Sequence, residues 1–354
     1  MTAHTQHPIS APPAAPIREK TGHLLLRGWC ILVLAGALSG TSLLMVLGPV
    51  AAGVAVFGSA FVSLALWLML RPAVQWPRLP WFGVGYLLLA VLSLVWSAWP
   101  STSALTLALL VSTSLHAVFI AAVLTWRELV RAIASALKWV LGLSLVFELW
   151  VSLVWGGPIL PRFVRPEGTV DDPIVLWSRD NLLDGGRIQG LFGNSNALAY
   201  VALLAMVVFG IRFASRAPRR TLLVAWFALA AFLFVRAGSA TAYLAAGLTA
   251  VVLLTALLMR TTRRPGERTR YYVLYAVVAL GGLAALWFGR NTVFSLLGRS
   301  ADLTGRESIW SAVLERAAER PVFGWGFATP WVPTDPAFDR WIVDHGQTVM
   351  QAHN

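Results

Sequence analysis

Long apolar runs recur along this chain and constrain its fold more than any other feature of the sequence. Each run extends for about 20 residues, the length that an α-helix needs to cross the hydrocarbon core of a bilayer. The chain of 354 residues is 57% hydrophobic and only 12% charged, whereas soluble domains carry about 25% charged residues. We therefore predict an all-α fold, a polytopic transmembrane helical bundle.

The apolar runs predict nine membrane spans. They cover residues 29–47, 50–70, 81–98, 103–124, 133–155, 191–211, 221–236, 239–259 and 271–289. The chain begins with a polar segment rich in Pro and Ala, which is typical of disorder. It thus divides into a disordered cytoplasmic tail (1–27), a transmembrane bundle (28–289) with an outer loop at 156–190, and a second outer segment (290–354).

Basic residues lie mostly in the short connections between the runs. With the N-terminus in the cytoplasm, the inner segments hold sixteen Lys or Arg and three acids, as the positive-inside rule expects. This distribution accounts for the net charge of +12, so we predict contact with membrane lipids and not with nucleic acid. The single cysteine, Cys30, excludes a disulfide or a cysteine-based metal site within one chain.

Polar side chains gather where the outer loop enters the next span, in the stretch GRIQGLFGNSN. Arg187 lies just outside the span, and Asn194 and Asn196 lie about one turn inside it. Arg is suited to bidentate contact with phosphate, and Asn to a sugar or an amide. The alternative is structural: the two Asn cap the helix and Arg187 pairs with Asp184. The residue chemistry leaves both interpretations open, whereas at Arg236 it favours a tight turn with a snorkelling side chain.

The last outer segment predicts an amphipathic helix from Gly305 to Arg320. Its apolar face comprises Ile309, Trp310, Val313, Leu314 and Ala317. Arg306 near its N-terminus adds a cation to the positive end of the helix dipole, where anions such as phosphate bind. Beyond the helix, His353 near Arg-rich segments is a candidate general base.

Four spaced motifs resemble the O-antigen ligase family, which includes O-antigen polymerases and protein O-oligosaccharyltransferases. LVWSAWPSTSALTLA matches the first motif, and GRIQGLFGNSNALA matches the second through Arg187, Gly190, Phe192, Asn194 and Asn196. LTGRESIWSAVLERAAERPVFGWGF matches the third through Gly305, Arg306, Trp310, Pro321, Gly324 and Gly326, and the fourth is the pair His353 and Asn354. Together these motifs cover about residues 85–354.

The resemblance implies an enzyme of the bacterial cytoplasmic (inner) membrane, with its active face outside the cytoplasm. The donor would be a glycan on undecaprenyl diphosphate, and the acceptor a lipid, a cell-wall polymer or a second glycan. Arg187 and Arg306 would hold the diphosphate, His353 would act as the base, and Arg236, Asn194, Asn196 and Asn354 would contact the substrate. The family requires neither a metal nor a nucleotide sugar, so we expect no cofactor.

The chain departs from the family pattern at two places. Ala240 stands where the family commonly has Arg, and Arg236 lies nearby. The family also continues through further spans after its His-Asn pair, so we expect the chain ending at Asn354 to be a truncated form with weak or no activity. A membrane transporter or flippase for a polysaccharide precursor is the alternative function, for which Lys138, Glu148 and His116 are the ionisable residues within the spans. Ligase and polymerase activities are not distinguished.

Overall fold

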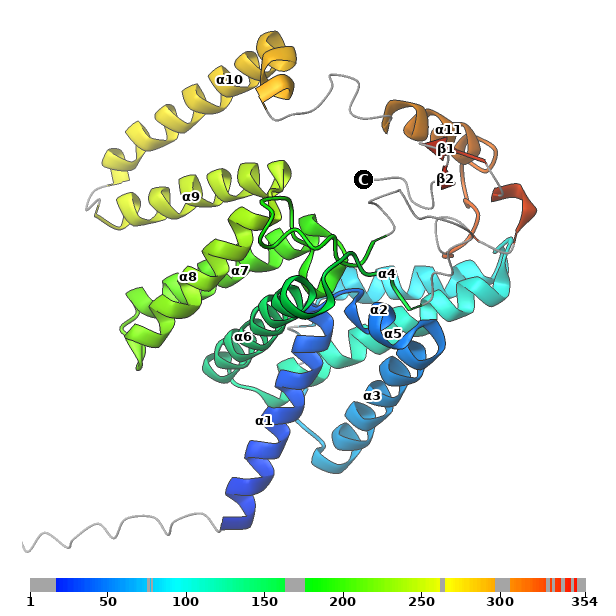
Figure 1. The fold of residues 1–354 in the computed structure, drawn as a ribbon. Coiled ribbons are helices and arrows are strands. Elements are labelled where there is room, and N and C mark those ends of the chain that lie inside the picture. Colours follow the sequence, from blue (N-terminus) through cyan, green and yellow to red (C-terminus); the bar gives the residue numbers. More distant parts are fainter. Residues whose placement is uncertain are drawn as a thin grey trace, which may run out of the picture. The chain divides into compact units, whose positions relative to one another are not determined.

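The structure is a computed structural model that describes residues 17–74, 77, 79–162, 176–261, 265–296, 306–328, 332, 335–338, 341–344 and 347–348 (Figure 1). Its α-helices are α1 (Ile17–Leu38), α2 (Ser42–Leu47), α3 (Pro49–Leu70), α4 (Trp81–Leu92), α5 (Pro100–Val123), α6 (Trp126–Trp150), α7 (Ser195–Ala214), α8 (Arg220–Ala237), α9 (Ala240–Thr261), α10 (Pro265–Leu296) and α11 (Arg306–Ala318). Short helical turns are η2 (Ser93–Val95), η3 (Val151–Trp155), η4 (Gly190–Phe192) and η6 (Pro336–Phe338). A pair of two-residue strands, β1 (Val343–Asp344) and β2 (Gln347–Thr348), completes the described elements.

The predicted helical membrane bundle is confirmed. Seven helices within the described residues are long and apolar enough to cross a membrane: Thr21–Leu38, Pro49–Leu70, Pro100–Val123, Trp126–Trp155, Ser195–Ala214, Arg220–Ala237 and Ala240–Arg260. The expected span at 81–98 corresponds to a shorter apolar helix, Trp81–Val95. The expected span at 271–289 lies inside the 32-residue helix α10, which is not among the seven.

The first expected span, 29–47, differs from the structure. Helix α1 already begins at Ile17, so residues 17–27, expected in a disordered tail, are helical. It ends at Leu38, and a turn leads into α2. Gly40 adopts a φ of +59° in this turn, which favours glycine. The Thr41 hydroxyl donates to the Phe192 carbonyl at 2.8 Å, so a residue far along the chain holds the turn.

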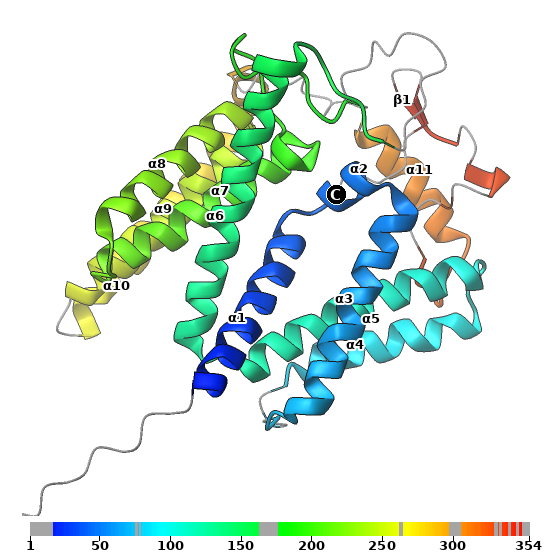
Figure 2. The same cartoon turned by 60° about the horizontal axis from the view of Figure 1, so that its bottom comes forward.

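The chain forms two compact units, of which the first comprises Met1–Pro49 and Ile120–Ala237. Within unit 1, α7 packs along α8 and α1 packs along α6 (Figure 2). Many buried residues of these helices are small, including Ala132, Ala134 and Ala136 on α6 and Ala199, Ala202 and Ala205 on α7. Small side chains let helix backbones approach closely, which is how helices associate where lipid surrounds them.

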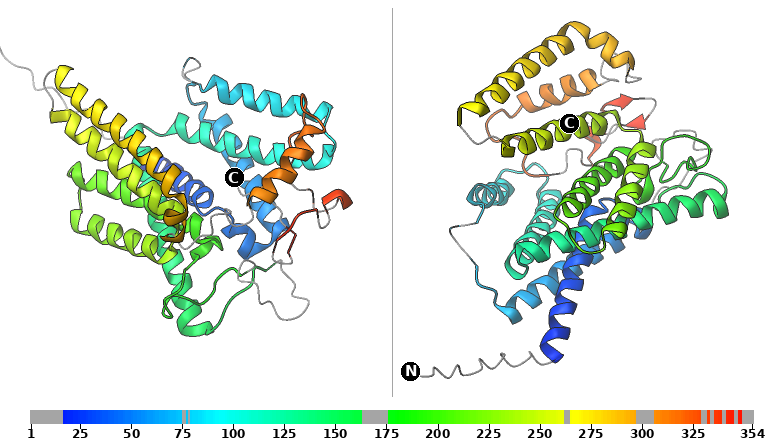
Figure 3. Two further views of the ribbon diagram at one scale, coloured as in Figure 1. Left: turned by 90° about the horizontal axis from the view of Figure 1, so that it is seen from above. Right: turned by 90° about the vertical axis from the view of Figure 1, so that its left-hand side faces the viewer.

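Unit 2 comprises Val50–Phe119 and Gly238–Asn354. It contains α3, α4 and α5 from the first stretch and α9, α10 and α11 from the second. The long helices α9 and α10 lie side by side (Figure 3). Trp67 of α3 meets Phe119 of α5, with their ring centroids 6.3 Å apart.

Helix α11 occupies the place of the predicted amphipathic helix, but its apolar face is divided. Ile309 is buried in a small core with Val332, Phe338 and Ile342, and Val313 packs against this core. Trp310 and Leu314 were expected on the same face, yet 38% and 68% of their surfaces are exposed.

Candidate functional site

A buried carboxylate holds the described part of the loop between α6 and α7 in place. Glu148 of α6 is 0% exposed. Its Oε1 accepts from the backbone N–H of Gln189 at 3.0 Å and of Gly190 at 2.6 Å, and its Oε2 accepts from the Ser178 hydroxyl at 2.9 Å. A buried carboxylate is stable only when such partners satisfy it. One side chain therefore joins both ends of the described loop segment 176–190 to α6.

The loop reaches Glu148 because Gly190 permits close approach. Its φ is +56°, and a Cβ added there would meet the Ser144 Cβ and Oγ at 3.0 Å and the Leu198 Cδ1 at 3.3 Å. The Ser144 hydroxyl also accepts from the Leu191 N–H at 3.4 Å. A side chain on Gly190 would therefore push the loop off α6.

Trp177 adds an aromatic contact to the same loop. Its ring stacks on Phe147 of α6, with centroids 4.5 Å apart, and its Nε1 donates to the Leu191 carbonyl at 3.1 Å. Backbone bonds between Ile159 and residues 177 and 178 close the base of the loop at 2.7–3.2 Å. The described part of the loop thus packs against α6.

Two of the predicted arginines meet where this loop contacts the end of α8. Arg187 donates through Nε to the Ala237 carbonyl at 3.0 Å and through Nη2 to the Asn196 side chain at 3.3 Å. Arg236 donates through Nη2 to the carbonyls of Asn181 and Leu182 at 2.6 and 2.8 Å. The structure therefore brings together Arg187, Arg236 and Asn196.

These two arginines are used differently. The Arg236 guanidinium is half-buried and bonds two loop carbonyls, and its own carbonyl accepts from the Ile188 N–H at 3.1 Å. The tight turn that the sequence favoured is present between α8 and α9, but Arg236 does not snorkel there, because its side chain ties α8 to the loop. Arg187 is exposed, and its contacts with Ala237 and Asn196 orient the side chain.

Asn194 and Asn196 also have different roles. Asn194 is the N-cap of α7, and its Oδ1 accepts from the N–H of Asn196 at 2.8 Å and of Ala197 at 3.2 Å. The structural interpretation therefore applies to Asn194. The Asn196 side chain instead accepts from Arg187.

In unit 2, two of the sequence motifs meet although more than 200 residues separate them. The Ala98 N–H donates to the Trp325 carbonyl at 3.0 Å, and Trp96 Nε1 donates to the Phe323 carbonyl at 2.7 Å. The Phe327 N–H donates to Ser93 Oγ at 3.0 Å. The segment after α4 thus pairs with the segment after α11.

Ser97 and Gly326 form the closest approach between these two segments. Gly326 has a φ of +96°, and a Cβ there would lie 2.6 Å from the Ser97 Cβ and 2.7 Å from its Cα. Ser97 Oγ bonds to the Ser103 hydroxyl at 2.7 Å and accepts from the Trp99 N–H at 3.1 Å. The glycine and the serines of the two motifs are therefore complementary packing partners.

Trp99 extends this contact. Its ring stacks on Trp325, with centroids 5.6 Å apart, and its Nε1 donates to the Asp335 carboxylate. The Ala337 N–H, bonded at 2.8 Å, and the Trp99 indole hold the pKa of Asp335 below its usual value. The Arg316 side chain of α11 lies over the rings of Trp325 and Trp341, at 5.4 and 5.3 Å from their centroids.

The remaining predicted site residues are described only in part. Arg306 is the first residue of α11, but its side chain lies outside the description, as do His353 and Asn354. Their roles stay predictions.

Sequence reasoning missed the role of Glu148, which it considered only as an ionisable group for a transporter. The available signal was its position near the outer end of a span, because a carboxylate there requires a partner. The partners could not be read from the sequence, since Ser178 and Gly190 lie 30 and 42 residues beyond Glu148 in the chain.

The fold defines an α-helical, multi-pass membrane protein. Residues 225–354, from α8 to the end of the chain, match the family model for O-antigen ligase. This match confirms the predicted resemblance to the O-antigen ligase family over the matched segment. The motifs around Ser97 and Arg187 precede the matched segment. Searches of curated proteins and of solved structures found no match.

Proposed function

We propose that this membrane glycosyltransferase moves a glycan from undecaprenyl diphosphate to an acceptor hydroxyl on the outer face of the cytoplasmic membrane. One observation carries the proposal: the exposed Arg187 is held by Ala237 and Asn196 on a loop that a buried carboxylate fixes to α6. A cation that is oriented in advance stabilises developing negative charge without reorganising during the reaction. The family match to a ligase-type enzyme supports the same chemistry.

In the proposed reaction the acceptor oxygen attacks the anomeric carbon of the donor glycan. The bond between that carbon and the diphosphate oxygen breaks, and the lipid diphosphate leaves with the electron pair. Arg187 and Arg306 neutralise the leaving diphosphate, and His353 takes the proton of the acceptor hydroxyl. Asn354 contacts the substrate, and Asn196 orients Arg187. Arg236 and Asn194 act as positioning residues through the loop and the start of α7.

Arg187→Ala is expected to lower glycan transfer roughly tenfold to a hundredfold, because a fixed cation at the leaving group is lost. The full-length protein would be placed in proteoliposomes with the undecaprenyl-diphosphate-linked glycan and an envelope fraction of the source organism as acceptor. Release of undecaprenyl diphosphate gives the rate. Arg162→Ala is the matched control, because Arg162 is an exposed arginine of the same outer loop. Equal rates of glycan transfer for the two variants would contradict a role of Arg187 in the site.

His353→Ala is expected to lower turnover about a hundredfold while donor affinity stays unchanged, because a general base acts on the acceptor and not on the diphosphate. Donor binding and turnover would be measured separately in the same proteoliposomes. His345→Ala is the control histidine of the same segment. A loss of donor affinity in His353→Ala would contradict the assigned role.

The transporter alternative depended on ionisable groups that meet inside a span. Lys138 and Glu148 lie on one helix, about 15 Å apart along its axis at 1.5 Å per residue. Glu148 bonds the outer loop, and Lys138 lies 5.8 Å from the centroid of the Trp226 ring. These contacts favour the enzyme. The test is whether the wild-type protein moves a fluorescent donor across the bilayer. Movement of the donor without transfer of its glycan would favour the transporter over the enzyme.

A further inference from the structure

A second polar site lies in unit 1 at the end opposite Arg187. It is a pocket of about 370 Å³ among α1, α6, α7 and α8. Five cationic side chains line it: Arg27, Arg131, Lys138, Arg212 and Arg219. Arg219 precedes the 18-residue helix α8, whereas Arg187 bonds its last residue, Ala237, so about 27 Å of helix separates the two sites.

The positive charge of this pocket has no counter-charge in its lining. Of the lining residues within the described part of unit 1, none is acidic. Glu128 lies near the same end of α6, but its carboxylate accepts from the N–H and hydroxyl of Thr125 and pairs with His23 at 2.9 Å. Five like charges around one cavity repel each other. The arrangement therefore favours a bound anion.

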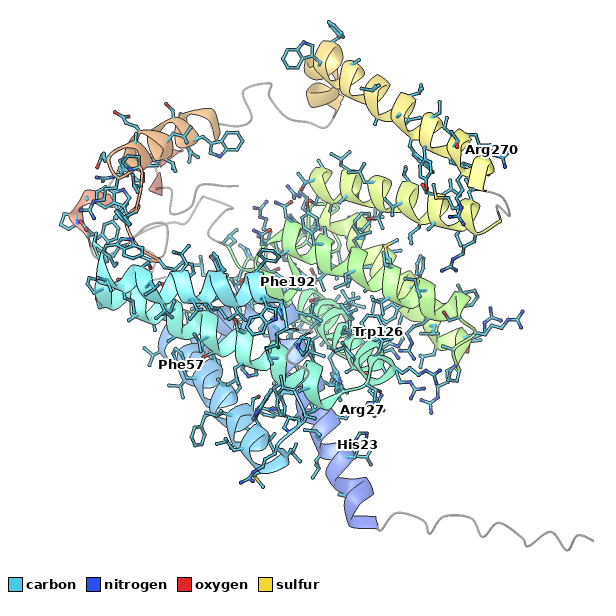
Figure 4. All side chains as sticks on the ribbon, turned by 180° about the vertical axis from the view of Figure 1, so that it is seen from behind. His23, Arg27, Phe57, Trp126, Phe192 and Arg270 are labelled. Atoms are coloured by element: carbon cyan, nitrogen blue, oxygen red, sulfur yellow. The ribbon has the colours of Figure 1, made fainter. Side chains whose placement is uncertain are left out.

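Arg27 provides an independent observation that points to a ligand. Its Nε is buried and has no hydrogen-bond partner among the residues that the structure describes. A buried N–H donor without an acceptor costs free energy, and an anion in the pocket would satisfy it. Arg27 lies on α1 beside the beginning of α6, one turn after His23 (Figure 4).

The positive-inside rule explains why cations lie at this end of the helices but not why they converge. Other arginines of the same connection are used differently. Arg220 lies over the Phe213 ring, 4.4 Å from its centroid, and Arg216 is exposed. Arg216 and Arg220 therefore behave as ordinary surface arginines at the end of a membrane helix. The five cations that line the pocket differ from them because they converge on one cavity.

We propose that this pocket binds a phosphate-bearing anion. Arginine forks suit phosphate oxygens, and the lysine adds a further point charge. Leu222 and Leu223 continue the lining on one side, which favours the headgroup of an anionic phospholipid over a soluble phosphate, because lipid chains need an apolar wall beside the charges. The proposed anion site does not depend on the proposed glycan transfer. Evidence against glycan transfer would leave the anion site unaffected.

The test compares the full-length wild-type protein with Arg131→Gln/Arg212→Gln. The control is Arg127→Gln/Arg216→Gln, which removes two cations of the same connections that do not line the pocket. Native mass spectrometry in detergent would measure binding of phosphatidylglycerol, with phosphatidylcholine as the neutral comparison. Inorganic pyrophosphate is the soluble probe. The pocket variant is expected to bind at least about tenfold more weakly than the wild type, and the control to bind within twofold of it.

The possible results distinguish a lipid headgroup from a soluble phosphate as the ligand of the pocket. Phosphatidylglycerol bound by the wild type and lost in the pocket variant supports a lipid headgroup. Pyrophosphate bound with the same variant dependence, without lipid binding, supports the phosphate site with a soluble ligand. Equal binding by the pocket variant and the control, or binding of neither probe by the wild type, would overturn the proposal. The thermal shift caused by each probe gives a second measurement, in which the wild type gains more stability than the pocket variant.

Discussion

Glu148→Ala is expected to lower the free energy of unfolding by roughly 3–5 kcal/mol. The substitution leaves the N–H groups of Gln189 and Gly190 and the hydroxyl of Ser178 without their acceptor. Each of these donors lies in a buried residue, so water cannot readily replace the carboxylate. We expect the loop between α6 and α7 to open while α6 itself stays helical.

Thermal unfolding in detergent and amide hydrogen exchange would test this expectation. The amides of Gln189 and Gly190 should exchange much faster in Glu148→Ala, and glycan transfer should fall together with loop order, because Arg187 lies on the same loop. Glu148→Gln keeps one acceptor oxygen and should lose less stability.

Glu128→Ala is the matched control on the same helix. It removes the side chain that closes a capping box with Thr125, a contact worth about 1 kcal/mol. Equal destabilisation of Glu128→Ala and Glu148→Ala would show that the buried carboxylate does not hold the loop.

Gly326→Ala is the second substitution with a large expected effect, roughly 2–5 kcal/mol of destabilisation. Alanine at a φ of +96° is strained, and its Cβ would overlap Ser97, including the Cα of that residue. Because a backbone atom is involved, the clash is not relieved by a change of side-chain rotamer. The contact between Ala98 and Trp325 should then open.

Gly324→Ala distinguishes the cost of backbone strain at a positive φ from the cost of steric overlap with a neighbouring segment. Gly324 also has a positive φ, +65°, but a Cβ there meets nothing within 4 Å. Its substitution should cost only the backbone term of roughly 1–2 kcal/mol. Melting temperatures of the two variants, with hydrogen exchange at residues 93–99 and 323–327, give the comparison. A Gly324→Ala variant as unstable as Gly326→Ala would contradict the packing argument.

The helices were the most predictable part of the molecule. A run of about 20 apolar residues has few alternatives to a membrane helix, and the predicted spans from 103–124 to 239–259 all correspond to long apolar helices. The first run was misplaced because hydropathy does not register the break between α1 and α2. That break depends on Gly40 and on the bond from Thr41 to Phe192, which is remote in sequence.

Helix α11 shows the same limit on a smaller scale. The spacing of apolar residues predicted its position and one continuous face. The structure instead buries Ile309 and leaves Leu314 exposed. Which positions are covered depends on Val332, Phe338 and Ile342, whose packing no helical period can specify.

The sequence by itself determined the class of protein, the residues of most of the spans and the polar residues worth examining. These follow from local chemistry, because hydropathy and motif spacing need no knowledge of distant partners. Only the tertiary structure decided how those polar groups are used. Glu148 holds a loop, and Arg236 ties α8 to that loop. Gly326 packs closely against Ser97 because it has no Cβ. Each of these roles depends on hydrogen bonds or contacts between segments far apart in the chain, which form only when the helices have packed.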